Sequence, residues 1–213
     1  AAAIDILSDF TLNPDSGKCL LIKGYAGTGK TSLIAGYVKT LQKLKVPFEL
    51  LAPTGRAAKV LTDYSGIKAL TIHKCIYRQK SISEGIGKFV LNLNKLTNAI
   101  FIVDEASMIS NSSFEDSAFG SGKLLSDMVE FVKQGKNCRL IVVGDTAQLP
   151  PVGLDISPAL DARELAMFNL DVQEIFLNEV VRQDLGSGIL FNATRIRQIL
   201  DSTAISTPKF DVS

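Results

Sequence analysis

The segment that most constrains this 213-residue chain comprises residues 24–31, which read GYAGTGKT. It matches the pattern G-x-x-x-x-G-K-[ST] in full, and it lies between an apolar run at residues 19–22 and helical spacing that starts at Leu33. Glycines at these positions let backbone N–H groups surround a phosphate, and a helix N-terminus adds partial positive charge. Lys30 would then reach the β- and γ-phosphates, and the Thr31 hydroxyl would ligate Mg²⁺. The predicted cofactor-binding residues are Gly24, Ala26, Gly27, Thr28, Gly29, Lys30 and Thr31.

Short apolar runs recur along the chain and end close to glycine, proline or acidic residues. Runs of this kind, without polar alternation, are typical of strands buried on both faces of a parallel sheet. Helical spacing lies between several of them, including a helix predicted to begin at Thr54 as its N-cap and one that ends at Gly135. This alternation predicts an α/β fold with a doubly wound, mostly parallel sheet that binds ligands at the carboxyl ends of its strands. The runs are residues 19–22, 48–51, 100–103, 140–143 and 175–177, and the helical patterns are residues 33–44, 54–61 and 124–132.

Residues 78–94 do not fit this scheme. They contain Gly85 and Gly87, and polar and apolar residues alternate from Phe89 to Leu93. Alternation of this kind beside glycines predicts a small β-hairpin inserted into the α/β fold.

Composition excludes several classes of protein. Apolar residues make up 46% of the chain and charged residues 21%, as in ordinary globular domains. No apolar run approaches the roughly 20 residues that span a bilayer, so we expect no membrane segment. The three cysteines lie far apart and there is one histidine, which argues against a zinc site and indicates a reducing cytoplasm.

The net charge of +1 conceals an uneven distribution of charge. Residues 56–95 contain eight basic and two acidic residues, a balance of +6, whereas residues 104–130 contain six acidic and one basic residue, a balance of −5. A local basic segment indicates either an anionic partner that contacts one face or a solvated surface. Both readings remain open on charge alone.

Polar side chains follow three of the later apolar runs. Asp104 and Glu105 come directly after residues 100–103; Asp104 would hold the hydration shell of Mg²⁺, and Glu105 would activate the attacking water. Two adjacent acids are costly to hold together without a cation, so we expect a metal there, held by Thr31 and Asp104. Gln148 can both donate and accept a hydrogen bond, which suits a γ-phosphate sensor, and Arg182 would reach the triphosphate. Ordinary surface positions remain the alternative for Gln148 and Arg182.

Six blocks, in order, resemble the first RecA-like motor domain of superfamily 1 DNA helicases in the 5′→3′ branch. That branch includes the RecD-like helicases, among them the alpha subunit of exodeoxyribonuclease V. The resemblance implies a RecA-like P-loop NTPase fold, ATP and Mg²⁺ as cofactors, single-stranded DNA as partner, and a role in DNA repair or recombination. The blocks are GYAGTGKT (24–31), APTGRAAK (52–59), TIHK (71–74), IVDEAS (102–107), VVGDTAQLPPVG (142–153) and LNEVVRQ (177–183).

The resemblance also implies roles for individual residues. Lys30, Asp104, Glu105, Gln148 and Arg182 would form the catalytic set, with Gln148 and Arg182 sensing the γ-phosphate. The hairpin at residues 78–94 would occupy the place of the insertion that carries the strand-separating pin. The implied DNA-binding residues are Thr54, Gly55, Arg56, Thr71, His73 and Lys74.

The resemblance covers about 160 residues and implies a partner domain that these 213 residues do not include. Residues 1–213 would be a single motor domain cut off before a second RecA-like domain, which supplies the arginine finger, so we expect the fragment to be poorly active. No glutamine precedes Gln42, so the family's adenine-reading glutamine is absent or lies before residue 1. A PhoH-like single-domain P-loop ATPase and a non-catalytic nucleotide-binding scaffold are the alternatives.

Overall fold

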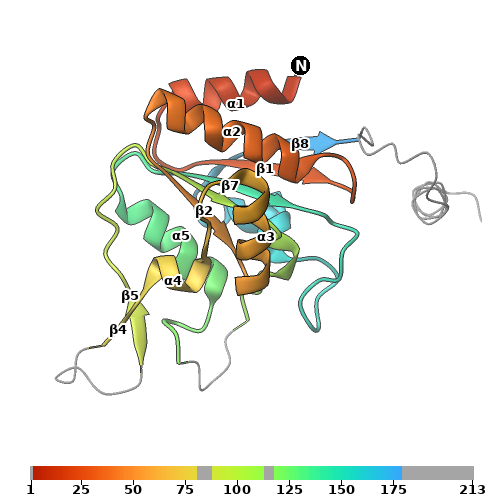
Figure 1. Ribbon diagram of the computed structural model, residues 1–213. Coiled ribbons are helices and arrows are strands. Elements are labelled where there is room, and N and C mark those ends of the chain that lie inside the picture. Colours follow the sequence, from red (N-terminus) through yellow and green to blue (C-terminus); the bar gives the residue numbers. More distant parts are fainter. Residues whose placement is uncertain (1, 81–87, 113–117, 179–213) are drawn as a thin grey trace, which may run out of the picture. The chain divides into compact units, whose positions relative to one another are not determined.

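The computed structural model describes residues 2–80, 88–112 and 118–178, and its core is a six-stranded sheet (Figure 1). The strand order is β3-β2-β6-β7-β1-β8, and every pairing in this sheet is parallel. All five predicted runs form strands, which confirms the parallel α/β sheet. The strands are β1 (Lys18–Gly24), β2 (Phe48–Ala52), β3 (Leu70–Thr71), β6 (Ile100–Val103), β7 (Arg139–Gly144) and β8 (Asp171–Leu177).

Helices cover both faces of the sheet, because the strands present apolar side chains in both directions. Leu20 and Ile22 of β1 pack with α1, α2 and α3, whereas Cys19 and Leu21 pack in the cluster that includes α4 and α5. Figure 1 shows α1 and α2 above the sheet and α4 and α5 below it. The helices are α1 (Ala2–Leu12), α2 (Lys30–Leu44), α3 (Gly55–Ser65), α4 (Ile72–Ile76), α5 (Leu124–Gln134) and α6 (Ala162–Ala166), with short 3-10 turns η2 (Ala106–Met108) and η3 (Pro158–Leu160).

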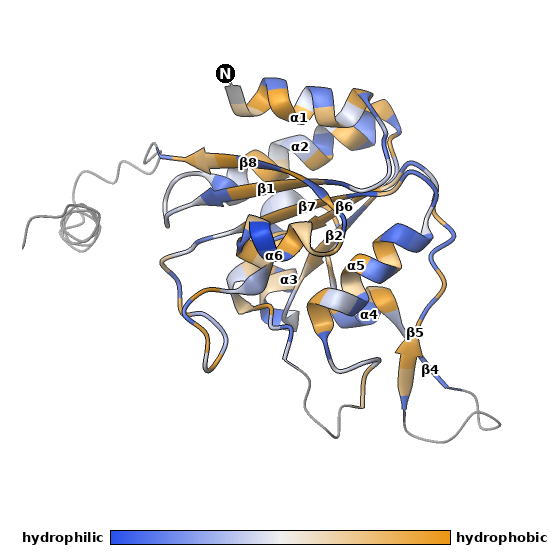
Figure 2. Cartoon of the chain, turned by 180° about the vertical axis from the view of Figure 1, so that it is seen from behind, coloured by the Kyte–Doolittle hydropathy of each residue, from blue (hydrophilic) through white to orange (hydrophobic). Residues whose placement is uncertain are grey.

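The central strands are buried on both faces and the edge strand β8 is not. Every residue of β6 and β7 is buried, but β8 alternates between half-buried and exposed residues. The expectation of full burial was therefore wrong for residues 175–177, because β8 has a neighbour on one side only. Figure 2 shows the corresponding pattern, with apolar strands inside and polar residues on the outer helix faces.

Helix ends follow the local sequence. Thr54 accepts a hydrogen bond from the Ala57 N–H at 3.2 Å, which confirms it as the N-cap of α3. Helix α5 ends before Gly135, as predicted, but this glycine is extended (φ −76°). A Cβ at residue 135 would lie 2.5 Å from the Cys138 sulfur, so close packing is what requires glycine there.

The predicted hairpin is confirmed in its described part. Strands β4 (Tyr77–Gln79) and β5 (Phe89–Leu91) are antiparallel, and Tyr77 pairs with Leu91. Phe119 packs against this hairpin, with its ring centroid 4.6 Å from that of Phe89. Residues 81–87 lie outside the described residues.

Helix α1 was not predicted, and a buried arginine ties it to the sheet. The Arg139 guanidinium, 1% exposed, donates hydrogen bonds to the carbonyls of Phe10, Thr11 and Asn98 and lies over the Phe10 ring. The position of α1 therefore depends on a residue far along the chain. None of the described helices is long and apolar enough to cross a membrane.

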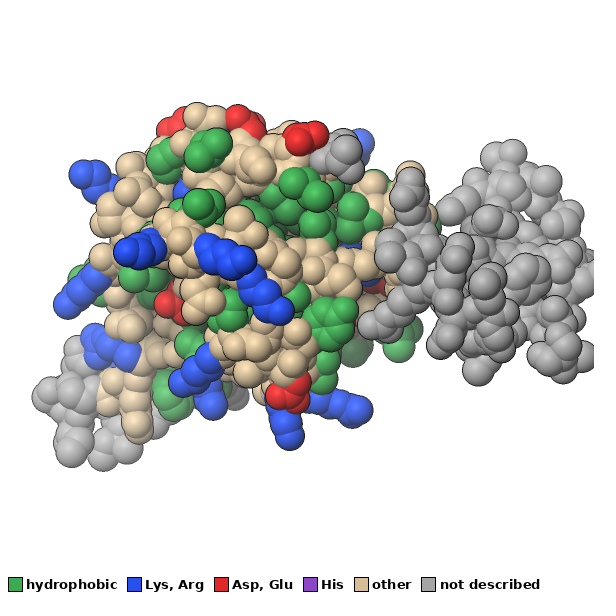
Figure 3. All heavy atoms as spheres, turned by 45° about the horizontal axis from the view of Figure 1, so that its top comes forward, with side chains coloured by type: hydrophobic (Ala, Val, Ile, Leu, Met, Phe, Trp, Pro, Cys, Tyr) green, Lys and Arg blue, Asp and Glu red, His purple; other side chains and the backbone are tan. Residues whose placement is uncertain are grey.

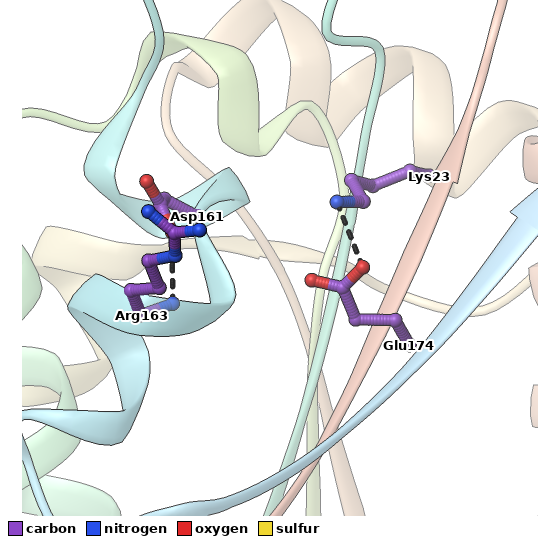
Figure 4. A network of polar contacts seen from close by, with 4 residues as sticks. All are labelled: Lys23, Asp161, Arg163 and Glu174. Carbon is purple, nitrogen blue, oxygen red and sulfur yellow. Dashed lines mark hydrogen bonds and ion pairs between the residues drawn. The ribbon is translucent and has the colours of Figure 1, made fainter.

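The edge strand is also joined to β1 by an ion pair. Lys23 Nζ lies 3.0 Å from a Glu174 carboxylate oxygen, and the two side chains point toward each other in Figure 4. Nearby, the Asp161 carboxylate accepts the Arg163 N–H at 2.8 Å and so caps α6. Both side chains of the ion pair are partly exposed, so it contributes about 1 kcal/mol at most.

Candidate nucleotide-binding and catalytic site

The loop at residues 24–31 has the backbone geometry that its glycines predict. Gly27 and Gly29 have φ of +84° and +83°, a conformation that other residues rarely adopt. A Cβ at Gly24 would lie 2.9 Å from the Leu177 carbonyl oxygen, so the neighbouring strand β8 requires glycine at this position. Helix α2 begins at Lys30, directly after Gly29, so the last two residues of the 24–31 segment form its N-terminus.

The Lys30 ammonium is held inside this loop. Its Nζ donates to the carbonyl oxygens of Gly24 at 2.7 Å and Tyr25 at 2.9 Å. The buried Thr28 hydroxyl also donates to the Tyr25 carbonyl, at 2.8 Å. The positive charge thus lies where the sequence predicted that phosphates would bind.

The Asp104 carboxylate lies at the tip of β6 and contacts the first turn of α2. Asp104 is 5% exposed, Oδ1 accepts the Glu105 N–H at 2.9 Å, and the Thr31 side chain is close enough to interact with the carboxylate. The pKa of Asp104 is raised to about 6, mainly by burial; the Glu105 charge also raises it, whereas the Glu105 N–H, the Lys30 charge and the Thr31 side chain lower it. The structure therefore brings together Thr31 and Asp104, the two predicted metal ligands.

Glu105 has an unusual backbone conformation. Its φ of +57° and ψ of +38° lie in the left-handed region, which costs a non-glycine residue about 1 kcal/mol or more. The chain turns there from β6 into η2, and the Glu105 side chain is half-buried. Strain at a predicted catalytic residue is consistent with a functional position, and no local sequence pattern signals it.

Gln148 is connected to the turn that follows Glu105. Its side-chain oxygen accepts the Ser107 hydroxyl at 2.8 Å, and its backbone N–H donates to the Asp145 carbonyl at 3.2 Å. Asp145 in turn accepts the Ala147 N–H at 2.9 Å through Oδ1. Asp145 and Ser107 lie within the sequence blocks 142–153 and 102–107, but the sequence predicted no role for either of them.

The two predicted DNA-binding segments lie at neighbouring strand ends. Strands β2 and β3 pair so that Ala52 lies opposite Thr71, and α3 and α4 begin just beyond them. The Thr54 and Thr71 hydroxyls cap the N-termini of α3 and α4. Gly55, Arg56 and Lys74 are exposed at these helix starts.

His73 is half-buried rather than exposed. Its ring centroid lies 5.0 Å from that of Phe119 and 5.6 Å from that of Tyr77. Burial lowers the pKa of His73, so the imidazole is neutral at pH 7. Its contact with DNA stays a prediction, as do the roles of the other site residues; Arg182 lies outside the described residues.

Basic residues do not form one continuous patch on the face that Figure 3 shows. Lys and Arg side chains are spread there among uncharged ones. Within the basic segment at residues 56–95, Arg56 and Lys74 are exposed at the adjacent starts of α3 and α4.

Comparison with known proteins identifies relatives of this chain. It is 30% identical over 138 residues to the ATP-dependent RecD2 DNA helicase of Deinococcus radiodurans, covering 63% of this chain and 16% of that protein. It is 28% identical over 202 residues to the ATP-dependent DNA helicase Pif1 of a Psychrobacter species, covering 88% of this chain and 28% of that protein. The chain thus spans less than a third of the length of these curated relatives.

A solved structure has the same fold. The Pif1 helicase from Bacteroides, in complex with ADP-AlF3 and ssDNA, matches with a TM-score of 0.54 at 16% identity, covering 97% of this chain and 51% of that chain. This similarity confirms the predicted RecA-like P-loop fold. The AAA domain family AAA_30 matches residues 12–198. The chain therefore belongs to the AAA domain family AAA_30.

Proposed function

We propose that this chain is the first motor domain of an ATP-dependent DNA helicase, in which Mg·ATP hydrolysis drives movement along single-stranded DNA. The observation that carries the proposal is the contact between the Thr31 side chain and the buried Asp104 carboxylate. Through it, the end of the phosphate loop and the tip of β6 form one site beside the Lys30 ammonium. The RecD2 and Pif1 relatives are ATP-dependent DNA helicases, which favours this function over the PhoH-like and scaffold alternatives.

The side chains at the site fit Mg²⁺. Thr31 and Asp104 offer the oxygen ligands that this ion prefers, and Mg²⁺ is usually held by one or two carboxylates together with substrate phosphates. When bound, the ion would neutralise charge on the β- and γ-phosphates.

The remaining groups of the site would orient and activate water. Glu105 would accept a proton from the attacking water, while Lys30 would bind the transferred phosphoryl group. Gln148 would report the presence of the γ-phosphate to η2 through Ser107. Arg182 would add a second positive charge at the triphosphate.

The proposed DNA contacts are Thr54, Gly55 and Arg56 at the start of α3, and Thr71, His73 and Lys74 at the start of α4. The Bacteroides Pif1 structure contains ssDNA, which supports this class of partner. A second RecA-like domain would form the other side of the DNA path. Cytoplasmic location, and a repair or recombination role like that of the exodeoxyribonuclease V alpha subunit, stay predictions.

Salt dependence tests the DNA contacts. Each neutralised phosphate contributes about −0.7 to the slope of log affinity against log salt for single strands, so three or four contacts predict a slope of about −2 to −3. Replacing Arg56 and Lys74 together with alanine should flatten this slope by about one to one and a half units. Fluorescence anisotropy with labelled oligo-dT at several salt concentrations measures it.

A matched control uses two other exposed lysines, Lys39 and Lys43 of α2. Their double alanine variant should keep the slope of the unmodified protein. If the Arg56 and Lys74 variant also kept it, the basic segment would be a solvated surface and the DNA contacts would lie elsewhere.

The pH dependence of Mg·ATP binding should reveal Asp104. Because burial raises the pKa of this carboxyl to about 6, it is ionised at pH 7 and becomes protonated as the pH falls through 6. The protonated form cannot hold a cation, so the affinity should decrease below pH 6. Asp104→Asn should bind Mg·ATP weakly at pH 7, and its affinity should lack the decrease below pH 6 that Asp104 causes. Asp155→Asn, in an exposed loop, should show the same pH dependence of Mg·ATP affinity as the unmodified protein. Identical pH profiles for Asp104→Asn and the unmodified protein would contradict the assignment.

A further inference from the structure

One oxygen of the Asp145 carboxylate has no hydrogen-bond partner although it is buried. Asp145 is 0% exposed; Oδ1 accepts the Ala147 N–H at 2.9 Å, and Oδ2 accepts no hydrogen bond. Only one other buried side-chain atom among the described residues, Arg139 Nε, shares this condition. An unpaired buried acceptor costs about 1–3 kcal/mol, and more when it is charged, so a residue of this kind calls for an explanation.

The position of Asp145 in the sheet supplies an explanation for its unpaired oxygen. Strand β7 lies between β6 and β1, and Asp145 directly follows it. The register pairs Val142 with Val103 and Gly144 with Lys23. Asp145 therefore follows β7 beside Gly24, where the phosphate loop begins, and one strand away from the tip that carries Asp104.

Asp145 also projects toward the face of the sheet on which the site lies. Val143 and Ile102 both pack in the cluster that includes α2. Because side chains alternate along a strand, Asp145 and Asp104, each two residues further on, point toward this same face. The contact between Thr31 of α2 and Asp104 lies there.

Two side-chain donors of the phosphate loop are directed to carbonyl oxygens of the loop itself. Lys30 donates to the carbonyls of Gly24 and Tyr25, and Thr28 donates to that of Tyr25. Asp145 Oδ2 therefore lies beside the loop without a donor from it. A donor that arrives with the ligand would satisfy this oxygen. Mg²⁺ usually keeps several water molecules when it binds with a nucleotide, and each such water donates hydrogen bonds.

We propose that Asp145 is a positioning residue whose Oδ2 accepts a hydrogen bond from a water molecule of the Mg·nucleotide complex. This inference rests on the proposed function. The bond between Oδ1 and the Ala147 N–H fixes the orientation of the carboxylate, and the Asp145 carbonyl accepts the Gln148 N–H. Asp145 thereby connects the hydration shell of the cation to the turn that carries Gln148.

Asp145→Asn isolates this role, because asparagine keeps Oδ1 for the Ala147 N–H and replaces Oδ2 with an amide that cannot accept. We would titrate a fluorescent ATP analogue in EDTA and at increasing Mg²⁺ concentrations. Loss of a partner outside the first coordination shell typically costs 10–100-fold in metal affinity. The Mg²⁺ concentration that gives half the maximal enhancement of nucleotide binding should therefore rise about tenfold or more, while the affinity in EDTA stays within twofold.

Asp161→Asn is the matched control, since Asp161 makes the same kind of turn bond at the start of α6. It should match the unmodified protein at every Mg²⁺ concentration. If Asp145→Asn weakened nucleotide binding equally with and without Mg²⁺, Asp145 would support the loop structurally, and the proposal would be overturned. An unchanged Mg²⁺ dependence of nucleotide binding would also overturn it.

A thermal unfolding measurement in EDTA provides a second readout. Because Asp145→Asn keeps the bond to the Ala147 N–H and removes no hydrogen bond of Oδ2, its midpoint should stay close to that of the unmodified protein. A lower midpoint would mean that Oδ2 makes a structural bond, which contradicts the proposal. If the unmodified protein itself bound no nucleotide, the proposed function would fail first, and that titration alone would show it.

Discussion

Lys30→Ala is expected to lower the affinity for Mg·ATP about 100-fold or more. Lys30 lies inside the loop at 2.7 and 2.9 Å from two carbonyl oxygens, and bound phosphates would offer it two anionic acceptors instead. A hydrogen bond to a charged group contributes about 1.5–3 kcal/mol, so two of them account for a loss of this size. Isothermal titration calorimetry of ATP in the presence of Mg²⁺ measures the change.

Lys23→Ala is the matched control for this experiment. Lys23 precedes the loop by one residue, but its ammonium pairs with Glu174 (Figure 4). Its removal should leave nucleotide affinity within a few-fold of the unmodified protein. Similar affinities for Lys30→Ala and the unmodified protein would show that residues 24–31 do not bind the phosphates.

Glu105→Gln is expected to slow ATP hydrolysis by about 10²–10⁴-fold, the usual contribution of a general base. Glutamine has nearly the same shape but cannot take the proton of the attacking water, so Mg·ATP binding should change little. Single-turnover hydrolysis of radiolabelled ATP with protein in excess measures the slow rates expected of this chain. Glu130→Gln, an exposed change on α5, should retain the unmodified rate.

Glu105→Gly separates backbone strain from chemistry. Glycine adopts a φ of +57° without the cost that glutamate bears, so this variant should unfold at a higher denaturant concentration. It should nevertheless hydrolyse ATP as slowly as Glu105→Gln. Full hydrolysis by either variant would assign the base to another residue.

The sequence predicted the sheet and the phosphate loop because both depend on local patterns. Apolar runs identify strands that are buried on both faces, and β6 and β7 are of this kind. The two-residue strand β3 and the five-residue helix α4 are too short to show a period. Helix α1 depends on Arg139, which lies more than a hundred residues away, so its packing could not be read from its own sequence.

The features of the candidate site were likewise only partly predictable from the local sequence. The glycines of the loop and the adjacent acids Asp104 and Glu105 were predictable, since their spacing carries the chemistry. The left-handed conformation of Glu105 and the unpaired oxygen of Asp145 were not, because both arise from the path of the backbone and from burial. The Ser107–Gln148 bond joins residues that are 41 positions apart and likewise exists only in the folded chain.

Residues 24–31 and Asp104 are expected to form a single Mg·nucleotide site. Calorimetric titration of ATP into the unmodified 213-residue chain, once with Mg²⁺ and once with EDTA, tests it most directly. We expect saturable binding of one ATP per chain, with a higher affinity in Mg²⁺ than in EDTA. Absence of saturable binding, or equal affinity under both conditions, would contradict it.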